Sequence, residues 1–148
     1  NSTLCAIRRI TLAALALTAV VARADVITDW NSKADAIITE SRLGTPPAIR
    51  VMALVQTAVF EAANAAKDPH QLAAAVAAAN RDAFVRVLPA QRATIEAAYA
   101  AALAAIPDSA SKSAGIAIGT QSANAALLLR STDLIRFVPT PTFAGTAL

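Results

Sequence analysis

Alanine accounts for 40 of the 148 residues, and this bias limits what the chain can fold into more than any other feature. Alanine has the highest helix propensity of the amino acids, but it buries little apolar surface per residue. The four glycines and the few β-branched runs leave little to favour a sheet. We therefore predict an all-α chain, of a length ordinary for one domain, with a core made largely of small side chains.

The first 24 residues have the three-part pattern of a secretory signal peptide. Arg8 and Arg9 precede an uncharged stretch at 10–22, and Ala22-Arg23-Ala24 places small residues at the two positions that a signal peptidase reads. The uncharged stretch is shorter than the roughly 20 residues that span a bilayer as a helix. We expect cleavage before Asp25 and an exported protein, periplasmic or secreted. The alternative is a buried or membrane-anchoring N-terminal helix.

The net charge of +3 belongs to this leading segment. Residues 1–24 hold three arginines and no acid, so 13 minus 3 leaves ten basic residues against ten acidic ones in the remainder. Those ten stand singly, as expected of solvated helix faces, whereas nucleic-acid binding needs clustered Lys and Arg. The only cysteine, Cys5, also lies in the leading segment. One Cys and one His fall short of the roughly four ligands of a zinc site. We expect no nucleic-acid partner, no disulfide framework and no such metal.

Two helices are predicted between residues 29 and 66. The first starts near Asp29, after an extended entry at 25–28, and ends at Gly44 in a left-handed C-cap. Its inward face is expected to be Trp30, Ala34, Ile37, Ile38 and Ser41. The second has Thr45 as N-cap and Pro46 in its first turn, and we expect it to be the most buried helix. Its inward face is expected to be Met52, Val55, Val59, Phe60 and Ala63.

Three further helices are predicted from the repeated start signals, in which a capping residue or a proline begins each one. Asp68-Pro69 opens a third helix, with the inward stripe Leu72, Val76, Ala79, Ala83 and Val87. Pro89 ends that helix and starts a fourth, with Ile95, Tyr99, Ala102, Leu103 and Ile106 on one side. Pro107-Asp108-Ser109 starts a fifth, from about Ala110 to Arg130, on Ile116, Gly119, Ala123 and Leu127.

The short connections predict that sequential helices are antiparallel neighbours. The predicted architecture is therefore about five antiparallel helices in a bundle over residues 25–130, followed by a Pro-containing tail or linker at 131–148. Large apolar residues are few, so the core is expected to be thin. We expect it to depend partly on a partner or on further sequence.

Candidate site residues are scarce. His70, the only histidine, stands in the first turn of the third predicted helix, where we expect an exposed residue rather than a general base. Glu61 and Asn64 lie one turn apart on the second predicted helix, either as a buried hydrogen-bonding pair or as the polar edge of the stripe. The sequence holds no paired carboxylates at catalytic spacing, no phosphate-binding loop and no nucleophile elbow. We assign no catalytic, cofactor-binding or metal residue.

Several segments, in this order, resemble the N-terminal half of bacterial vanadium-dependent haloperoxidase-like proteins. The first three are VITDWN at 26–31, GTPPAIR at 44–50 and VQTAVFEAANA at 55–65. LPAQRAT at 88–94 and the Ala-rich segments through 106–119 are similar to the same family. The resemblance extends from residue 26 to about 143. The loop at 65–69 looks shorter than the usual one, and the tail resembles the Pro-rich crossing that leads to the catalytic half.

The resemblance implies a helical bundle of the superfamily shared with bacterial acid phosphatases and type 2 phosphatidic acid phosphatases. Relatives hold vanadate or phosphate with a Lys followed seven residues later by Arg-Pro, a Ser-Gly-His segment, and an Arg with a downstream His. These 148 residues contain none of those motifs. The implied role is a non-catalytic N-terminal scaffold, with a C-terminal catalytic half or a second copy as partner, and vanadate only in a full-length relative. The alternative is a free-standing periplasmic helical binding or interaction module.

Overall fold

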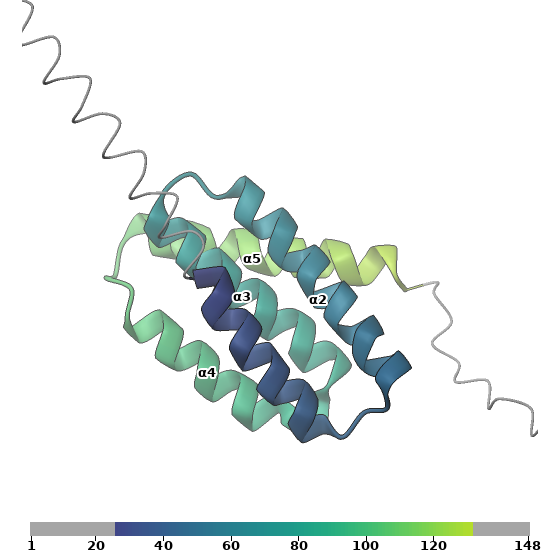
Figure 1. The fold of residues 1–148 in the computed structure, drawn as a ribbon. Coiled ribbons are helices and arrows are strands. Elements are labelled where there is room, and N and C mark those ends of the chain that lie inside the picture. Colours follow the sequence, from purple (N-terminus) through teal and green to yellow (C-terminus); the bar gives the residue numbers. More distant parts are fainter. Residues whose placement is uncertain (1–25, 132–148) are drawn as a thin grey trace, which may run out of the picture.

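The computed structural model describes residues 26–131, which form five α-helices, one short 3-10 turn and no strand (Figure 1). This confirms the all-α bundle. The signal segment predicted at 1–24 and all of the predicted tail except Ser131 lie outside the described residues. The helices span residues 26–41, α2 Thr45–Ala65, α3 Pro69–Val87, α4 Arg92–Ala104 and α5 Ala110–Leu129, with η1 Pro89–Gln91 before α4.

Helix α3 forms the centre of the bundle and packs against α2, α4 and α5 (Figure 1). The helix at 26–41 lies across the front of the view in Figure 1, between α2 and α4. Its polar edges reach both neighbours, because Gln56 donates to Asn31 over 2.8 Å and the Thr94 hydroxyl donates to Glu40 over 3.1 Å. Of its predicted inward face, Trp30, Ala34 and Ile37 are fully buried and Ile38 and Ser41 are partly buried.

The most buried helix is α3 rather than α2, so that prediction was wrong. Residues 74–80 of α3 are buried without a break, because alanine side chains let neighbouring helices approach on several sides. The inward face of α2 consists of Leu54, Val55, Ala58, Val59 and Ala62. Phe60, predicted to face inward, is 64% exposed. It follows the buried Val59, and one residue turns a helix by about 100°.

The closest packing in the bundle joins α3 to α5 at two glycines. A Cβ atom on Gly115 would lie 2.8 Å from the Cβ of Ala74, and one on Gly119 would lie 2.7 Å from the Cβ of Ala78. Each would also overlap a carbonyl oxygen of α3. Gly115 lies against Ala74, and Gly119, one turn later on α5, lies against Ala78, one turn later on α3. Helices α3 and α5 therefore run parallel. Helix α5 packs on α3 and α2 instead of lying along α4, which corrects the prediction that all sequential helices are antiparallel neighbours.

The predicted capping residues at the helix ends are confirmed in part. Asp68 caps α3, because its side chain accepts a hydrogen bond from the Gln71 amide over 2.9 Å. Gly44 has a φ of −65° and is itself the N-cap of α2, so its predicted left-handed C-cap and the predicted Thr45 N-cap were both wrong. The left-handed residue is Arg42, at a φ of 52°. The first helix is already helical at residue 26, where an extended entry was predicted.

Candidate functional site

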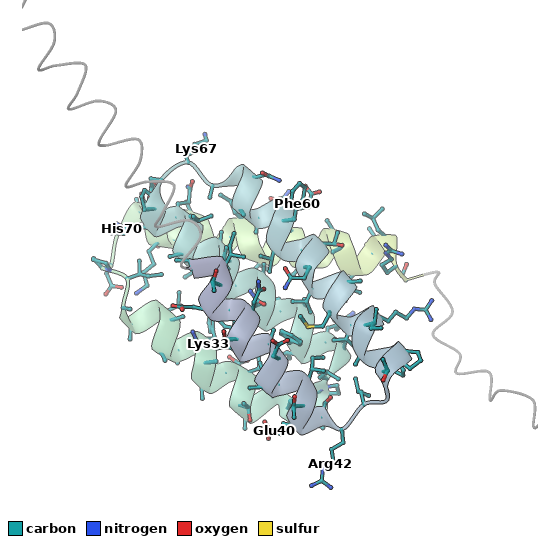
Figure 2. All side chains as sticks on the ribbon, in the orientation of Figure 1. Lys33, Glu40, Arg42, Phe60, Lys67 and His70 are labelled. Atoms are coloured by element: carbon teal, nitrogen blue, oxygen red, sulfur yellow. The ribbon has the colours of Figure 1, made fainter. Side chains whose placement is uncertain are left out.

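The candidate residues from the sequence are all exposed, and His70 lies on a different helix from Glu61 and Asn64 (His70 is labelled in Figure 2). His70 is exposed in the first turn of α3, as predicted. Glu61 and Asn64 are both exposed on α2, so the buried hydrogen-bonding pair was wrong and the polar-edge interpretation is confirmed. The buried stripe of α2 ends at Ala62, and these two residues flank it on the outer side of the helix.

Between residues 26 and 131, no three His, Cys, Asp or Glu side chains are grouped so that they could hold a metal ion. Among the helices of that range, none combines the length and the apolar character that crossing a bilayer requires.

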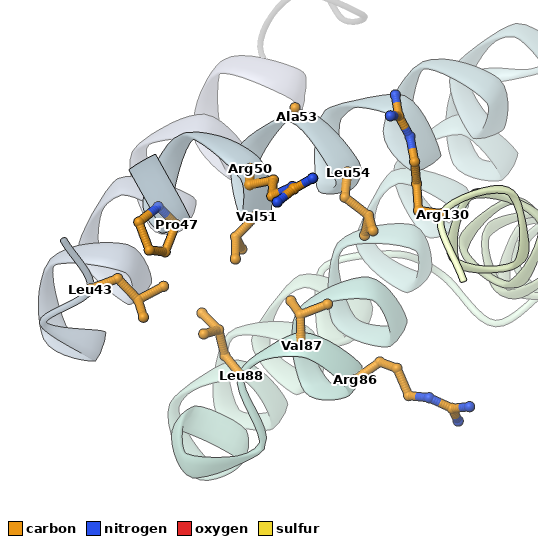
Figure 3. Close-up of a pocket in the computed structure, with 10 residues that line it drawn as sticks. All are labelled: Leu43, Pro47, Arg50, Val51, Ala53, Leu54, Arg86, Val87, Leu88 and Arg130. Atoms are coloured by element: carbon orange, nitrogen blue, oxygen red, sulfur yellow. The ribbon is translucent and has the colours of Figure 1, made fainter. Parts of the chain in front are cut away.

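A cleft of about 420 Å³ opens where the start of α2 meets the ends of α3 and α5 (Figure 3). Its walls combine three arginines with aliphatic side chains. The lining residues are Leu43, Pro47, Arg50, Val51, Ala53, Leu54, Arg86, Val87, Leu88 and Arg130. In Figure 3 Leu43 and Pro47 lie at the left of the view, Arg50 lies near its middle, and Arg86 and Arg130 lie toward its right, pointing in different directions.

None of the described residues that line the cleft is Asp or Glu. Within residues 26–131, Arg50 and Arg86 are exposed and neither forms an ion pair. Guanidinium groups in this state are well suited to bind carboxylate or phosphate oxygens through two parallel hydrogen bonds.

The described lining can bind a ligand but offers no group for acid–base or nucleophilic chemistry. Arginine stays protonated at any working pH, and the other lining side chains are aliphatic. General acid–base catalysis needs a titratable group within hydrogen-bond reach of the substrate. The cleft is therefore a candidate binding site rather than a candidate active site.

The sequence does not indicate this cleft, because its pattern predicts the three arginines as separate solvated positions. Arg50 lies on α2, Arg86 on α3 and Arg130 directly after α5, and they are 36 and 44 residues apart. They line one cleft only because the start of α2 lies beside the ends of α3 and α5. No local motif could have indicated this grouping.

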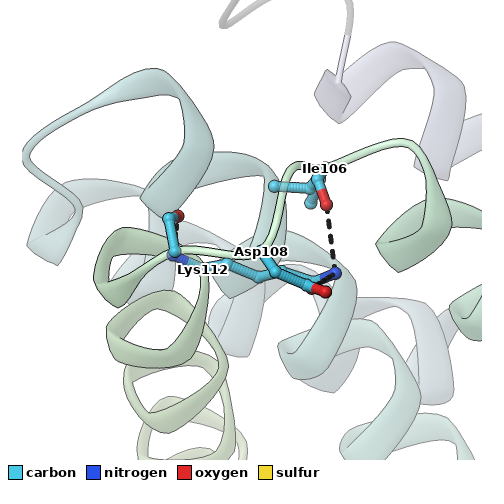
Figure 4. A network of polar contacts seen from close by, with 4 residues as sticks. Ile106, Asp108 and Lys112 are labelled. Atoms are coloured by element: carbon cyan, nitrogen blue, oxygen red, sulfur yellow. Dashed lines mark hydrogen bonds and ion pairs between the residues drawn. The ribbon is translucent and has the colours of Figure 1, made fainter.

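Other polar clusters of the bundle connect neighbouring segments through hydrogen bonds and an ion pair. Lys112 donates to the Ile106 carbonyl over 3.0 Å and pairs with Asp108 at 2.8 Å, which joins the start of α5 to the turn after α4 (Figure 4). The hydrogen bond and the charge of Lys112 lower the pKa of Asp108. Asp68 also accepts from the Ser111 hydroxyl over 2.8 Å, which links the starts of α3 and α5.

Arg81 on α3 forms the polar contact between α3 and α4. Its guanidinium lies 4.6 Å from the centre of the Tyr99 ring and pairs with Asp82 at 3.0 Å. Burial opposes the charge of Arg81, but the hydrogen bond with Tyr99 and the charge of Asp82 outweigh it and raise its pKa. The group therefore stays charged and has a structural role between the two helices.

Comparison with known proteins adds no relative. No protein-family description matches the chain, and no curated protein or solved structure is significantly similar to it. The resemblance to haloperoxidase-like proteins stays a prediction from the sequence motifs.

Proposed function

We propose that this chain is the non-catalytic N-terminal helical scaffold of an exported vanadium-dependent haloperoxidase or acid phosphatase-type protein. The proposal rests on the motif resemblance and on one structural observation, four large apolar side chains that are exposed on two adjacent helices. The full-length protein would oxidise halide with peroxide or hydrolyse phosphate esters, and the residues for that chemistry would come from a C-terminal half.

The apolar surface consists of large side chains on α2 and α5. Ile49 and Phe60 on α2 are each 64% exposed, and Leu128 and Leu129 on α5 are 74% and 75% exposed. Single exposed apolar residues are ordinary in soluble proteins, but here all four belong to two helices that pack on each other. We refer to Ile49, Phe60, Leu128 and Leu129 as the outer apolar surface. A packed partner would remove it from water.

The experiment is an activity comparison between this chain and a version extended at its C-terminus by the sequence that follows Leu148. Both are assayed for halide oxidation with vanadate and peroxide, and for phosphate-ester hydrolysis. We expect no activity from this chain alone and activity from the extended one. Turnover by this chain alone, or an inert extended chain that folds and binds vanadate, would contradict the proposal.

The cleft between α2, α3 and α5 favours a second candidate, a free-standing periplasmic helical binding module. The two candidates differ in what they require of the isolated chain. A binding module should be monomeric and melt cooperatively without a partner, and it should not need the outer apolar surface to be covered. A scaffold half with exposed apolar patches should self-associate or bind hydrophobic dyes. Sedimentation velocity and a thermal melt of the same sample separate them.

A further inference from the structure

We infer that two copies of this chain pair through the outer face of α2, with the two α2 helices antiparallel about a two-fold axis. The outer face of α2 consists of Ile49, Arg50, Ala53, Phe60 and Glu61, which are all exposed. The inference concerns the 148-residue chain and does not depend on the scaffold role. A C-terminal half that covers the outer apolar surface would compete with the second copy for Ile49 and Phe60.

The outer face of α2 carries the same kind of residue pair near each of its ends. A large apolar residue followed by a charged one stands at Ile49-Arg50 and again at Phe60-Glu61, eleven residues later. A helix turns by about 100° per residue, so eleven residues complete about three turns. Phe60 therefore lies on the same side of α2 as Ile49, and Glu61 lies on the same side as Arg50.

This spacing is self-complementary in an antiparallel pair of helices. A two-fold axis at the level of Val55, midway between the two residue pairs, places the start of each α2 against the end of the other. Ile49 of each copy then meets Phe60 of the other copy. Arg50 in turn meets Glu61, so opposite charges face each other twice. A parallel pair would place like charges against each other at both ends.

The two charged side chains are available for these contacts. Among residues 26–131, neither Arg50 nor Glu61 forms an ion pair within the chain. Exposed charge pairs contribute little to affinity, but they favour one orientation of two partners over another. The apolar contacts of Ile49 and Phe60, each 64% exposed, therefore supply the affinity, and the charges select the antiparallel arrangement.

The middle of the outer face allows two helices to approach closely. Ala53 has a small side chain, and the distance between packed helices depends on the side chains at their contact. Thr57, one turn later, donates its hydroxyl to the Ala53 carbonyl over 2.8 Å. A second copy packed here would therefore bury no hydroxyl donor that lacks an acceptor.

The test is sedimentation equilibrium of the full chain over roughly 10 μM to 1 mM, which covers dissociation constants in that range. We expect a reversible equilibrium that ends at the dimer. Arg50→Glu and Glu61→Arg change exposed side chains, so both variants should fold. Each replaces two attractive contacts per dimer by two repulsive ones and should raise the Kd at least about fivefold. Arg92→Glu on α4 makes the same charge change and should leave the Kd within about twofold.

Two rescue experiments are specific to the antiparallel pair. The double variant Arg50→Glu/Glu61→Arg restores both contacts with the charges exchanged, and its Kd should return to within about threefold of wild type. A mixture of the two single variants also restores both contacts, because one variant then carries only acids at these positions and the other only bases. With one variant labelled by a fluorophore, this heterodimer should be at least about fivefold tighter than either variant's own dimer.

Four results would overturn the inference. They are a monomer throughout the concentration range, association that grows past the dimer without a plateau, dimerisation that Arg50→Glu and Glu61→Arg leave unchanged, and no recovery in the double variant. None of them decides the scaffold proposal, which the activity of the C-terminally extended chain tests separately.

Discussion

Among residues 26–131, Arg42 alone has a left-handed backbone conformation, and no glycine in that range adopts one. A side chain with a Cβ atom pays a steric cost there that glycine avoids. Gly44, two residues later, has a φ of −65° and needs no such freedom. The first helix ends at residue 41, three residues before Gly44, which the sequence predicts as its end. The left-handed turn therefore falls at Arg42.

Arg42→Gly should therefore stabilise the bundle by about 0.5–1 kcal/mol, with part of the gain offset by the greater freedom of glycine in the unfolded chain. Urea unfolding of the chain measures the change. Arg42→Ala is the matched control, since it removes the guanidinium but keeps the Cβ. Equal stabilisation by both variants would show that charge, and not backbone strain, is the cause.

The lowered pKa of the Asp68 carboxyl makes the stability of the fold depend on pH. Hydrogen bonds from the Gln71 amide and the Ser111 hydroxyl lower the pKa of its carboxyl in the folded state, against an unfolded value of about 3.9. A lowered folded pKa contributes stability that is complete above the unfolded pKa and is lost as the pH falls through the folded one. Asp68→Asn should therefore destabilise the chain at neutral pH, with a deficit that shrinks below about pH 4.

Thermal melts of wild type and Asp68→Asn between pH 7 and pH 2.5 test this dependence. The same substitution at Asp35, which is exposed on the helix at 26–41, serves as control and should leave the pH profile parallel to that of the wild type. A constant difference between the Asp68→Asn and wild-type melting temperatures over the whole range would contradict the role assigned to the charge.

At the scale of the helices, the contact between α3 and α5 depends on the absence of side chains at Gly115 and Gly119. Alanine in a helix is favoured over glycine by about 1 kcal/mol, but a Cβ at Gly119 would meet both the backbone and the Ala78 side chain of α3. Overpacking of this kind costs about 1–3 kcal/mol, and rigid backbone leaves little room for relief. We therefore expect Gly119→Ala to lower the free energy of unfolding by about 1–2 kcal/mol.

Gly44→Ala is the natural control, because no atom lies within 4 Å of the position that its Cβ would take. It should change the free energy of unfolding by less than about 0.5 kcal/mol. Urea unfolding compares the two variants. If Gly119→Ala were as stable as the wild type or more so, α3 and α5 would not be in the close contact described here.

The starts of two helices could be predicted from the sequence, while helix pairing could not. Capping residues and prolines act locally, so Asp68-Pro69 and Ser109 marked the starts of α3 and α5 correctly. The inward face of α5 was harder, because large apolar side chains usually mark it. Here Ile116 and Leu127 are only partly buried, and the fully buried side is Gly115, Gly119, Ser122, Ala123 and Ala126. When the core is made of small residues, a stripe of large ones no longer identifies it.

At the scale of the whole molecule, the arrangement of helices creates two features that no segment contains. The cleft needs the ends of three helices at one place, and the outer apolar surface needs α2 and α5 side by side. Both depend on the packing of α5 against α3 and α2. The sequence predicts a thin core and a partner, but it does not indicate which large apolar side chains stay exposed.

Phe60→Lys tests that face. Phe60 is exposed in this chain, so the substitution should change the stability of the isolated chain by no more than about 0.5 kcal/mol. The scaffold proposal predicts that it weakens association with a C-terminal half at least tenfold, since it would place a charge in the proposed apolar interface. Thr28→Lys, exposed on the helix at 26–41, is the control for added charge. Equal association of both variants would remove the outer apolar surface from the proposed interface.

The proposal that these residues are the scaffold half of a haloperoxidase or phosphatase-type protein is tested by the coding sequence that follows Leu148. It predicts a continuous reading frame that encodes a Lys with Arg-Pro seven residues later, then a Ser-Gly-His segment, then an Arg with a downstream His. A stop codon directly after Leu148, or a continuing frame without those motifs, would contradict it.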